Sequence, residues 1–248
     1  MGLTRQQTTM IAVLLAGAFL VVLNQTLLTP ALPTIMSHLN VNATTVQWLT
    51  SGYALVEAVI IPLNAYLIGR FSTRKLFIGG MLLFAAGSAL CASAPSFPFL
   101  LLGRVMQACA TGVVMPMVFA LILLIFPREN RGVGMGLVGL IISFAPAMGP
   151  SVSGVLVDSI GWRAQFVLVA CLALCVVVAA LLALKKFEGF DCTTFDGLSV
   201  VLIAAGMVCL LYGISTSTSS PTPILPIVLI VVGLAVIVLF FRRQVKLE

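Results

Sequence analysis

The residues Leu100-Leu-Leu-Gly-Arg-Val-Met-Gln-Ala-Cys-Ala-Thr-Gly-Val-Val-Met-Pro116 set the class of this protein. They lie within a longer apolar run, from Phe97 to Phe126, in which Arg104 is the only charged residue. A run this long and this apolar predicts a membrane-spanning helix. An arginine within such a helix is energetically costly, so Arg104 is a candidate functional residue.

Polar residues recur on one side of this predicted helix. At about 3.6 residues per turn, Arg104, Gln107 and Thr111 share one face, and Met115 continues it. We expect this stripe to face protein or a water-filled cavity, and Arg104 to belong to a charge network. The alternative is that Arg104 extends along the helix and reaches the outer headgroups.

The composition of the whole chain agrees with a membrane protein. Of its 248 residues, 61% are hydrophobic and only 8% are charged, whereas a soluble domain carries about 25% charged residues. The formal net charge is +6, but the basic residues gather in short segments between apolar runs, which indicates membrane topology rather than nucleic-acid binding. The cysteines are scattered and the only histidine is His38, so no metal site and no cofactor are expected.

The pattern of apolar runs predicts an all-α membrane protein with eight spans. Polar segments at 185–196 and 216–223 indicate a linker and a loop. The predicted organisation is a bundle at 1–184, a cytoplasmic linker at 185–196, and two further spans with a short tail at 197–248. The spans are predicted at residues 9–31, 45–68, 76–94, 98–126, 133–157, 164–184, 197–215 and 223–241.

Lysine and arginine residues predict the orientation in the membrane. Short loops rich in these residues lie in the cytoplasm. If the spans alternate, the loop and terminal basic residues fall on one side, with the exception of Arg163. Both termini are therefore expected in the cytoplasm, with the protein in the cell membrane. The residues on the basic side are Arg5, Arg70, Arg74, Lys75, Arg128, Arg131, Lys185, Lys186, Arg242, Arg243 and Lys246.

Span one ends in a polar segment, Asn24-Gln-Thr-Leu-Leu-Thr-Pro-Ala-Leu-Pro33. Two prolines and several amides within lipid suggest a broken or kinked helix beside a cavity. Gln25 and Thr29 share a face of this helix. The alternative is that they only make hydrogen bonds between helices, worth about 0.6 kcal/mol each.

Glu57 is the only acidic residue deep within a predicted span. It lies about 11 residues into the span at 45–68, which at about 1.5 Å per residue places it near the middle of the bilayer. Burial disfavours the charged form of a carboxylate, so Glu57 could carry a proton. A charge pair with Arg104 would oppose that effect, and a neutral, hydrogen-bonded structural glutamate is the alternative.

Span five, predicted at 133–157, is rich in small residues. Residues of this kind at four-residue spacing let helices approach closely. Pro146 and Pro150 are expected to bend the helix. A bent, closely packed helix is a candidate hinge between two halves of a moving bundle, and packing without a hinge role is the alternative. The two small-residue series are Gly139, Ser143, Ala147 and Ser151, and Ala145, Gly149 and Ser153.

Six segments, in order along the chain, resemble motifs of the major facilitator superfamily, in its 14-helix drug:proton antiporter branch. The resemblance runs from span one to span eight and is closest to lincomycin-resistance-type multidrug exporters. The segments are Leu23-Asn-Gln-Thr-Leu-Leu-Thr-Pro-Ala-Leu-Pro33, Leu67-Ile-Gly-Arg-Phe-Ser-Thr-Arg-Lys75, Arg104-Val-Met-Gln-Ala108, Ala145-Pro-Ala-Met-Gly-Pro-Ser-Val-Ser-Gly154, Gly161-Trp-Arg163 and Phe195-Asp-Gly197.

The resemblance implies a fold and roles for these segments. The implied fold is a six-helix amino-terminal bundle, built as two three-helix inverted repeats, followed by two further helices. It also implies that Arg104 takes part in proton coupling. The implied cytoplasmic loop motif contains Arg70, Arg74 and Lys75, and the implied antiporter motif of span five contains Pro146, Gly149, Pro150 and Gly154.

Several positions depart from the family pattern. The family usually has an acid at the positions of Asn24 and Gly69, and glycine at those of Ala65 and Ser72. The loop acid normally pairs with a neighbouring arginine to latch one closed state. Neither that latch nor proton coupling through span one is expected here in the usual form. Glu57 is the candidate replacement for the proton carrier, although it matches no family motif.

The expected function is export of lipophilic, drug-like compounds by proton antiport, by this chain or by a transporter of which it is the amino-terminal half. A non-transporting membrane module that needs a partner is the alternative. An enzyme is not expected, because no nucleophile–base pair or phosphate-binding loop is evident. The expected partners are the lipid bilayer, protons, small lipophilic compounds including cations, and a carboxy-terminal half or a second copy. The expected substrate-cavity residues are Asn24, Gln25, Thr29, Gln107, Thr111 and Met115.

Overall fold

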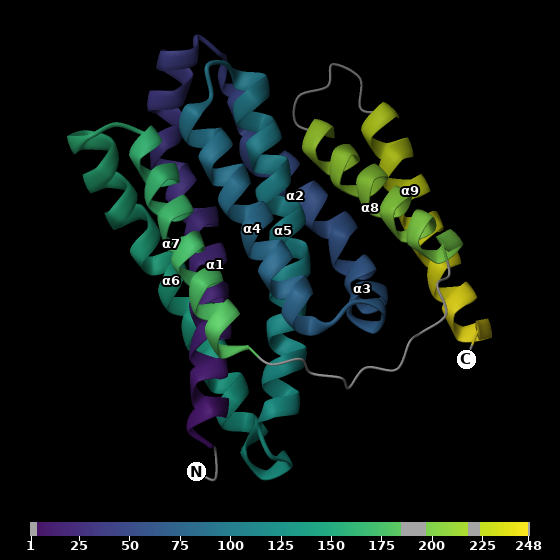
Figure 1. Ribbon diagram of the computed structural model, residues 1–248. Coiled ribbons are helices and arrows are strands. Elements are labelled where there is room, and N and C mark those ends of the chain that lie inside the picture. Colours follow the sequence, from purple (N-terminus) through teal and green to yellow (C-terminus); the bar gives the residue numbers. More distant parts are fainter. Residues whose placement is uncertain (1–3, 185–196, 218–223, 248) are drawn as a thin grey trace.

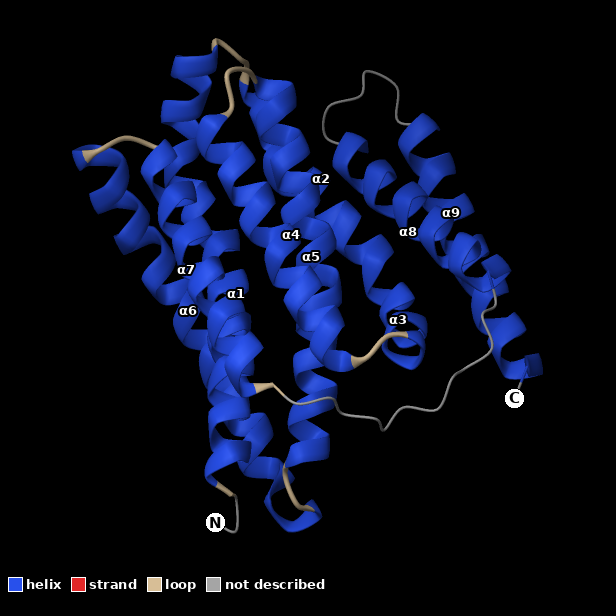
Figure 2. Ribbon diagram, in the orientation of Figure 1, coloured by secondary structure: helices blue, strands red, loops and turns tan. Residues whose placement is uncertain are grey.

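The computed structural model describes residues 4–184, 197–217 and 224–247, and within them it contains helices and no strand (Figures 1 and 2). The all-α prediction is therefore confirmed. The predicted linker at 185–196 and most of the predicted loop at 216–223 lie outside the described residues. The helices are α1 (Arg5–Leu39), α2 (Ala43–Ile60), η1 (Ile61–Leu63), α3 (Asn64–Arg70), α4 (Thr73–Ser93), α5 (Phe97–Ile125), η2 (Arg128–Asn130), α6 (Arg131–Ser159), α7 (Arg163–Ala183), α8 (Gly197–Ser217) and α9 (Ile224–Leu247).

Each of the predicted spans falls on helical segments of the structure. In the described part of the chain, seven helical stretches are long and apolar enough to cross a membrane, and α8 contributes a shorter apolar stretch, Val201–Ile214. The start of α1 and the end of α9 point toward the same end of the bundle (Figure 1). This arrangement is the one that an even number of crossings produces.

Helix α1 extends further than predicted and is unbroken. It begins at a capping box, in which Thr4 accepts from the backbone N–H of Gln7, and it passes through Pro30 and Pro33 without an interruption. It ends at Asn40, whose left-handed backbone (φ 52°) lets its N–H bond to the carbonyl of Met36. Of the broken or kinked helix predicted for span one, the broken form was wrong.

The break lies instead in span two. Pro62 occupies the short 3₁₀ turn η1, which separates α2 from α3. Proline lacks an N–H and its ring clashes with the preceding turn, so the regular ladder cannot continue unchanged through it. Directly after the turn, the Nδ2 of Asn64 donates to the carbonyl of Val113 on α5 at 2.7 Å. The break is thus fixed by an amide that reaches the neighbouring helix.

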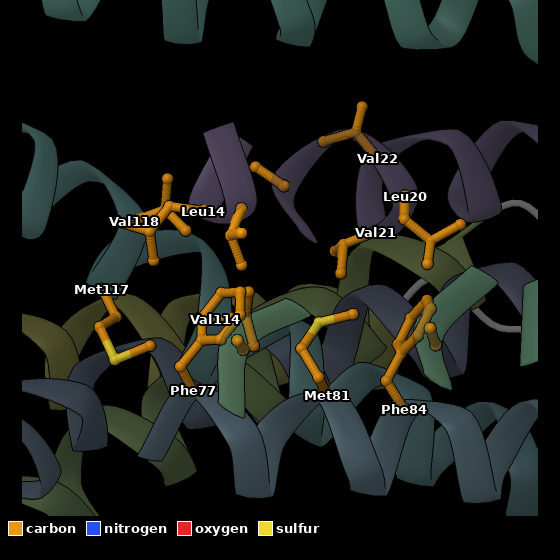
Figure 3. Close-up of a cluster of buried hydrophobic side chains, with 14 of the residues drawn as sticks. Leu14, Leu20, Val21, Val22, Phe77, Met81, Phe84, Val114, Met117 and Val118 are labelled. Carbon is orange, nitrogen blue, oxygen red and sulfur yellow. The ribbon is translucent and has the colours of Figure 1, made fainter. Parts of the chain in front are cut away.

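The apolar core lies between α1, α4 and α5 (Figure 3). Side chains from the three helices interdigitate there, among them Leu14, Phe77 and Val118, all of which are buried. Gly17 permits this packing, because a Cβ at that position would lie 2.7 Å from the ring of Phe77. On one side of the core, α6 packs on α1, and α7 packs on α4 and α1. On the other, α2 lies between α5 and the α8–α9 pair.

Only one of the two small-residue series in α6 packs against the bundle. Ala145, Gly149 and Ser153 are buried along α1 and α7. Residues of the other series, Gly139, Ser143, Ala147 and Ser151, are exposed. Gly149 is the point of closest approach, because a Cβ there would lie 2.0 Å from the Oγ1 of Thr26 and 3.2 Å from its carbonyl carbon.

Gly149→Ala is therefore expected to destabilise the bundle, by about 1–3 kcal/mol, because α6 must move away from α1. The matched control is Gly154→Ala on the same helix, where a Cβ meets nothing within 4 Å. That variant should be neutral or stabilising by up to about 1 kcal/mol, since alanine favours helix. Thermal unfolding in detergent measures both. Equal stability of the two variants would contradict the close approach at Gly149.

Candidate functional site

Arg104 lies inside the bundle and is enclosed by protein. Its side chain is only 1% exposed. Its Nε donates to the carbonyl of Leu49 on α2 at 3.2 Å, and its NH1 donates to the Oε1 of Gln107 at 2.8 Å. The guanidinium also lies over the ring of Tyr53, 4.2 Å from the centroid, a favourable cation–π arrangement. The stripe therefore faces protein, as expected, and the alternative of a headgroup-seeking arginine is wrong.

Gln107 joins three helices at this point. Its Oε1 accepts from Arg104 and also from the Nδ2 of Asn24 on α1, at 3.3 Å. Its Nε2 donates to the Oγ of Ser88 on α4 at 2.8 Å, and Ser88 donates to the carbonyl of Phe84. All four polar side chains are buried. Such a network is stable in a low-dielectric interior because each partner is hydrogen-bonded.

The polar network continues toward Glu57. Thr111 donates to the carbonyl of Gln107 at 2.9 Å and forms a hydrogen bond with the hydroxyl of Tyr53. Glu57 follows Tyr53 by one helical turn and accepts from the Nε2 of Gln25 on α1 at 3.0 Å. Glu57 is half-buried, whereas Tyr53 is fully buried. The site thus has a fixed cationic interior and a carboxylate closer to the surface of the bundle.

The described hydrogen bonds of Arg104 reach Leu49 and Gln107, and that of Glu57 comes from Gln25. Arg104 is therefore held by neutral oxygens and an aromatic face. The Glu57 carboxylate accepts from Gln25 and is partly exposed. Arg104 is thus enclosed while Glu57 is partly exposed. A site needs this difference if the Arg104 charge is structural and the Glu57 carboxylate exchanges one bound group for another.

The predicted substrate-cavity residues fall into two groups. Asn24, Gln107 and Thr111 are buried in the network. Gln25 and Met115 are partly exposed, and Thr29 is exposed. The second group is at least partly accessible from outside the bundle.

Tyr53 and Ser88 were missed by the sequence reasoning. Tyr53 lies four residues from both Leu49 and Glu57, so the three share one face of α2. That spacing from the only acid deep within a predicted span was the available signal. Ser88 gives no signal beyond being a small polar residue in an apolar helix, since its partner Gln107 lies on another helix.

The basic loop residues lie together at the end of the bundle, away from Arg104. Arg70 donates to the hydroxyl of Tyr66 at 2.9 Å. Arg74 donates to the carbonyl of Leu181 at 2.6 Å, which joins the start of α4 to the end of α7. Lys75 is exposed in the first turn of α4. The structure therefore separates the loop motif from the buried network.

The Gly161-Trp-Arg segment makes the turn between α6 and α7 at the opposite end. Gly161 has a φ of 102°, a conformation that favours glycine. Arg163 donates to the carbonyl of Ala94 at 2.7 Å and lies over the ring of Trp162, 4.4 Å from its centroid. This motif is a structural clamp between the α4–α5 turn and α7.

No group of three or more His, Cys, Asp or Glu side chains that could hold a metal ion occurs among the residues that the structure describes. The free cysteines there are spread over α4, α5, α7 and α8. The polar chemistry of the described bundle is concentrated instead around Arg104 and Glu57.

Comparisons with known proteins identify the family of the chain. The family model described as Major Facilitator Superfamily matches residues 14–189. The uncharacterised MFS-type transporter YcnB of Bacillus subtilis is 42% identical over 246 residues, 98% of this chain and 52% of the relative. The lincomycin resistance protein LmrB of the same organism is 37% identical over 245 residues, 96% of this chain and 50% of LmrB.

Solved structures with low sequence identity share the fold. A bacterial homologue of the human lysosomal transporter Spinster, inward-facing and occupied, matches 88% of this chain and 54% of its own, with a TM-score of 0.69 at 19% identity. The human organic anion transporter MFSD10 matches 89% of this chain and 58% of its own, with a TM-score of 0.68 at 14% identity. The present chain spans about half the length of the curated relatives it matches. It belongs to the major facilitator superfamily, a family of membrane transporters and not of enzymes.

Proposed function

We propose that this chain forms the first half of a proton-driven exporter of lipophilic, drug-like compounds, cations among them, in the cell membrane. The observation that carries the proposal is the half-buried carboxylate of Glu57, held by Gln25 near the fully buried guanidinium of Arg104. Names of relatives that refer to lincomycin and multidrug resistance support the substrate class.

In the proposed mechanism, one carboxylate alternates between two occupants. When Glu57 is deprotonated it attracts a lipophilic cation, and when it takes up a proton the attraction is lost and the cation leaves. Gln25 positions the carboxylate, and Thr29 and Met115 supply further polar and apolar contact to the substrate. A polarisable methionine accommodates ligands of different shapes.

Arg104 has a positioning role in this mechanism. Its contacts to Leu49, Gln107 and Tyr53 join α2 to α5 and keep the carboxylate-bearing face of α2 in place. A planar guanidinium with several fixed donors is suited to this positioning.

The substrate site is completed by a second half. Sites in transporters of this kind lie near the bilayer midplane between repeats, and the curated relatives are about twice as long as this chain. The exposed small-residue series of α6, at Gly139, Ser143, Ala147 and Ser151, offers a surface that another bundle can approach closely. In this proposal Pro146, Gly149, Pro150 and Gly154 form the hinge along which α6 moves against that bundle.

The experiment compares the chain alone with the chain co-expressed with the second half of one of the Bacillus subtilis relatives. Everted vesicles are energised, and uptake of a fluorescent lipophilic cation is followed. We expect uptake by the pair, collapse of that uptake by a protonophore, and none by the chain alone. Uptake that survives the protonophore contradicts proton coupling.

The second candidate function is a membrane module that does not transport but associates with a partner or itself. The exposed small-residue series of α6 favours it, since small residues at this spacing let helices of two chains approach closely. A stable dimer of the chain in lipid, together with no uptake in either vesicle preparation, would support this function and contradict the exporter.

The proposed orientation, with both termini in the cytoplasm, predicts which ends of α6 can be labelled from outside. Glu129 and Asp158 are both exposed and lie near opposite ends of this helix. In a background without other cysteines, Asp158→Cys should react with a membrane-impermeant maleimide in whole cells, and Glu129→Cys only after permeabilisation. The reverse pattern would invert the topology.

A further inference from the structure

A second feature of the bundle is a groove between α4 and α5, separate from the Arg104 network. It has a volume of about 270 Å³. On α4 it runs from Lys75 past Gly79 to Leu83, and on α5 it is bordered by Cys109 and Val113. Its lining is almost entirely apolar, and Lys75 is the only charged residue that borders it. Its volume is below the roughly 300–1,000 Å³ of a drug-sized pocket, so a single chain fits it better than a whole drug.

The length of the groove matches one leaflet of a membrane. Lys75 and Leu83 are eight residues apart on one helix, which is about 12 Å at a rise of about 1.5 Å per residue. One leaflet contributes about 15 Å of the roughly 30 Å hydrocarbon core. An occupant with a polar end at Lys75 and an apolar tail toward the midplane therefore fits the groove.

The two neighbouring glycines of α4 have different steric surroundings. A Cβ at Gly80 would lie 2.8 Å from the Cγ2 of Val114, so Gly80 sets the close packing of α4 on α5. A Cβ at Gly79 would meet nothing within 4 Å. Gly79 is exposed in the groove, and the space in front of it is open to a ligand.

The polar end of the groove favours an anion. Lys75 is exposed in the first turn of α4, where the backbone N–H groups lack intrahelical partners and the helix dipole is positive. Arg74 stands in the same turn, and the N-cap residue Ser72 makes no side-chain capping bond. Arg74 donates to the Leu181 carbonyl on α7, so Lys75 is the basic residue that borders the groove. A cation at a helix start is unfavourable unless a negative charge is present. A basic pocket between membrane helices matches an anionic lipid headgroup.

We propose that this groove binds one anionic phospholipid, with its phosphate at Lys75 and the start of α4, and one acyl chain along Gly79 toward Leu83. The lipid then fills the space between α4 and α5 at the basic end of the bundle. The site is independent of Glu57 and of the substrate, so it stands whether or not the proposed transport activity is correct.

The test uses the purified chain in detergent and native mass spectrometry. The probes are dioleoylphosphatidylglycerol, dioleoylphosphatidylcholine with the same acyl chains, and glycerol phosphate with none. We expect the first bound lipid to be phosphatidylglycerol, with about a tenfold preference over phosphatidylcholine, and no binding of glycerol phosphate. If the two lipids bind equally, the proposed preference for an anionic headgroup is overturned. If glycerol phosphate binds as well as phosphatidylglycerol, the proposed acyl-chain site is overturned.

Two variants and two matched controls localise the site. Lys75→Gln removes the charge, and Gly79→Leu fills the groove. Each variant should bind phosphatidylglycerol only about as well as phosphatidylcholine. Arg131→Gln removes an exposed charge from α6, and Gly136→Leu adds a side chain at a helical glycine with nothing within 4 Å, at a similar distance from a helix start. Both controls should keep the preference. The same loss in the controls overturns the assignment to this groove.

A measurement on the unmutated chain covers the case in which Gly79→Leu does not fold. Cys109 borders the groove, whereas Cys171 is exposed on α7 and does not. Phosphatidylglycerol should slow the reaction of Cys109 with a lipid-soluble maleimide severalfold and leave Cys171 unchanged. Equal rates with and without phosphatidylglycerol overturn the proposal. It is also overturned if a co-expressed second half protects Cys109 and abolishes lipid binding.

Discussion

Arg104→Ala is expected to reduce export by the assembled transporter to the background of vesicles without protein, while the chain still inserts in the membrane. The variant removes the donor to the carbonyl of Leu49 and to Gln107, and the cation over Tyr53. Hydrogen bonds to a charged group are worth about 1.5–3 kcal/mol each, so α2 loses its main polar attachment to α5. Efflux in energised vesicles measures the loss, and size-exclusion chromatography checks insertion and folding.

Arg104→Lys separates charge from geometry. Lysine keeps the positive charge but cannot place two fixed donors toward Leu49 and Gln107. We expect about a tenfold or larger loss of efflux. The matched control is Arg163→Ala, which also removes a bond to a backbone carbonyl and a contact to an aromatic face, but outside the polar network. Full efflux by Arg104→Ala, or equal loss in Arg163→Ala, would contradict a specific role for Arg104.

Glu57→Gln is expected to eliminate export driven by a pH gradient and to leave binding of uncharged ligands within about twofold of wild type. Glutamine has nearly the volume of the protonated glutamic acid and can still pair with Gln25. It cannot lose a proton, so it cannot exchange one for a cation. In the wild type, cation affinity should rise with pH as Glu57 loses its proton, and in the variant it should not change with pH.

The control for Glu57→Gln is Glu129→Gln, which neutralises an exposed acid in the turn between α5 and α6. Cation affinity measured by fluorescence polarisation across a pH series distinguishes the two positions. The control should follow the wild-type pH dependence. If Glu57→Gln exports at the wild-type rate with the wild-type pH dependence, the proton is carried by another group, or the driving force is not a proton.

The sequence was informative where a charged residue lies in an apolar run, because burying that charge in lipid is energetically costly. A charged side chain in a long apolar run has to find protein partners, which is why Arg104 and the face it shares with Gln107 and Thr111 could be predicted. The same reasoning identified Glu57. The partners of Arg104 could not be predicted, because the Leu49 carbonyl and Tyr53 come from α2, and their approach depends on how the helices cross.

Whether a helix continues through a proline, and which of its faces packs on the bundle, could be predicted less well from the sequence. Prolines in α1 and at the end of α2 look alike in sequence, yet the helix continues through Pro30 and Pro33 and is interrupted at Pro62. The neighbouring helices decide the outcome, since Asn64 attaches to α5 directly after the interruption. The two small-residue series of α6 were also equivalent in sequence. Only the structure shows that Gly149 meets Thr26 while Gly139 meets nothing within 4 Å.

The most direct test of the proposed exchange at Glu57 is proton release on substrate binding. A lipophilic cation such as tetraphenylphosphonium is added to the purified two-half assembly in weakly buffered detergent solution, and a pH indicator is followed. The account predicts release of about one proton per bound cation from the wild type, because both compete for one carboxylate, and none from Glu57→Gln. Equal release from wild type and Glu57→Gln, or cation binding to the wild type without any release, would contradict it.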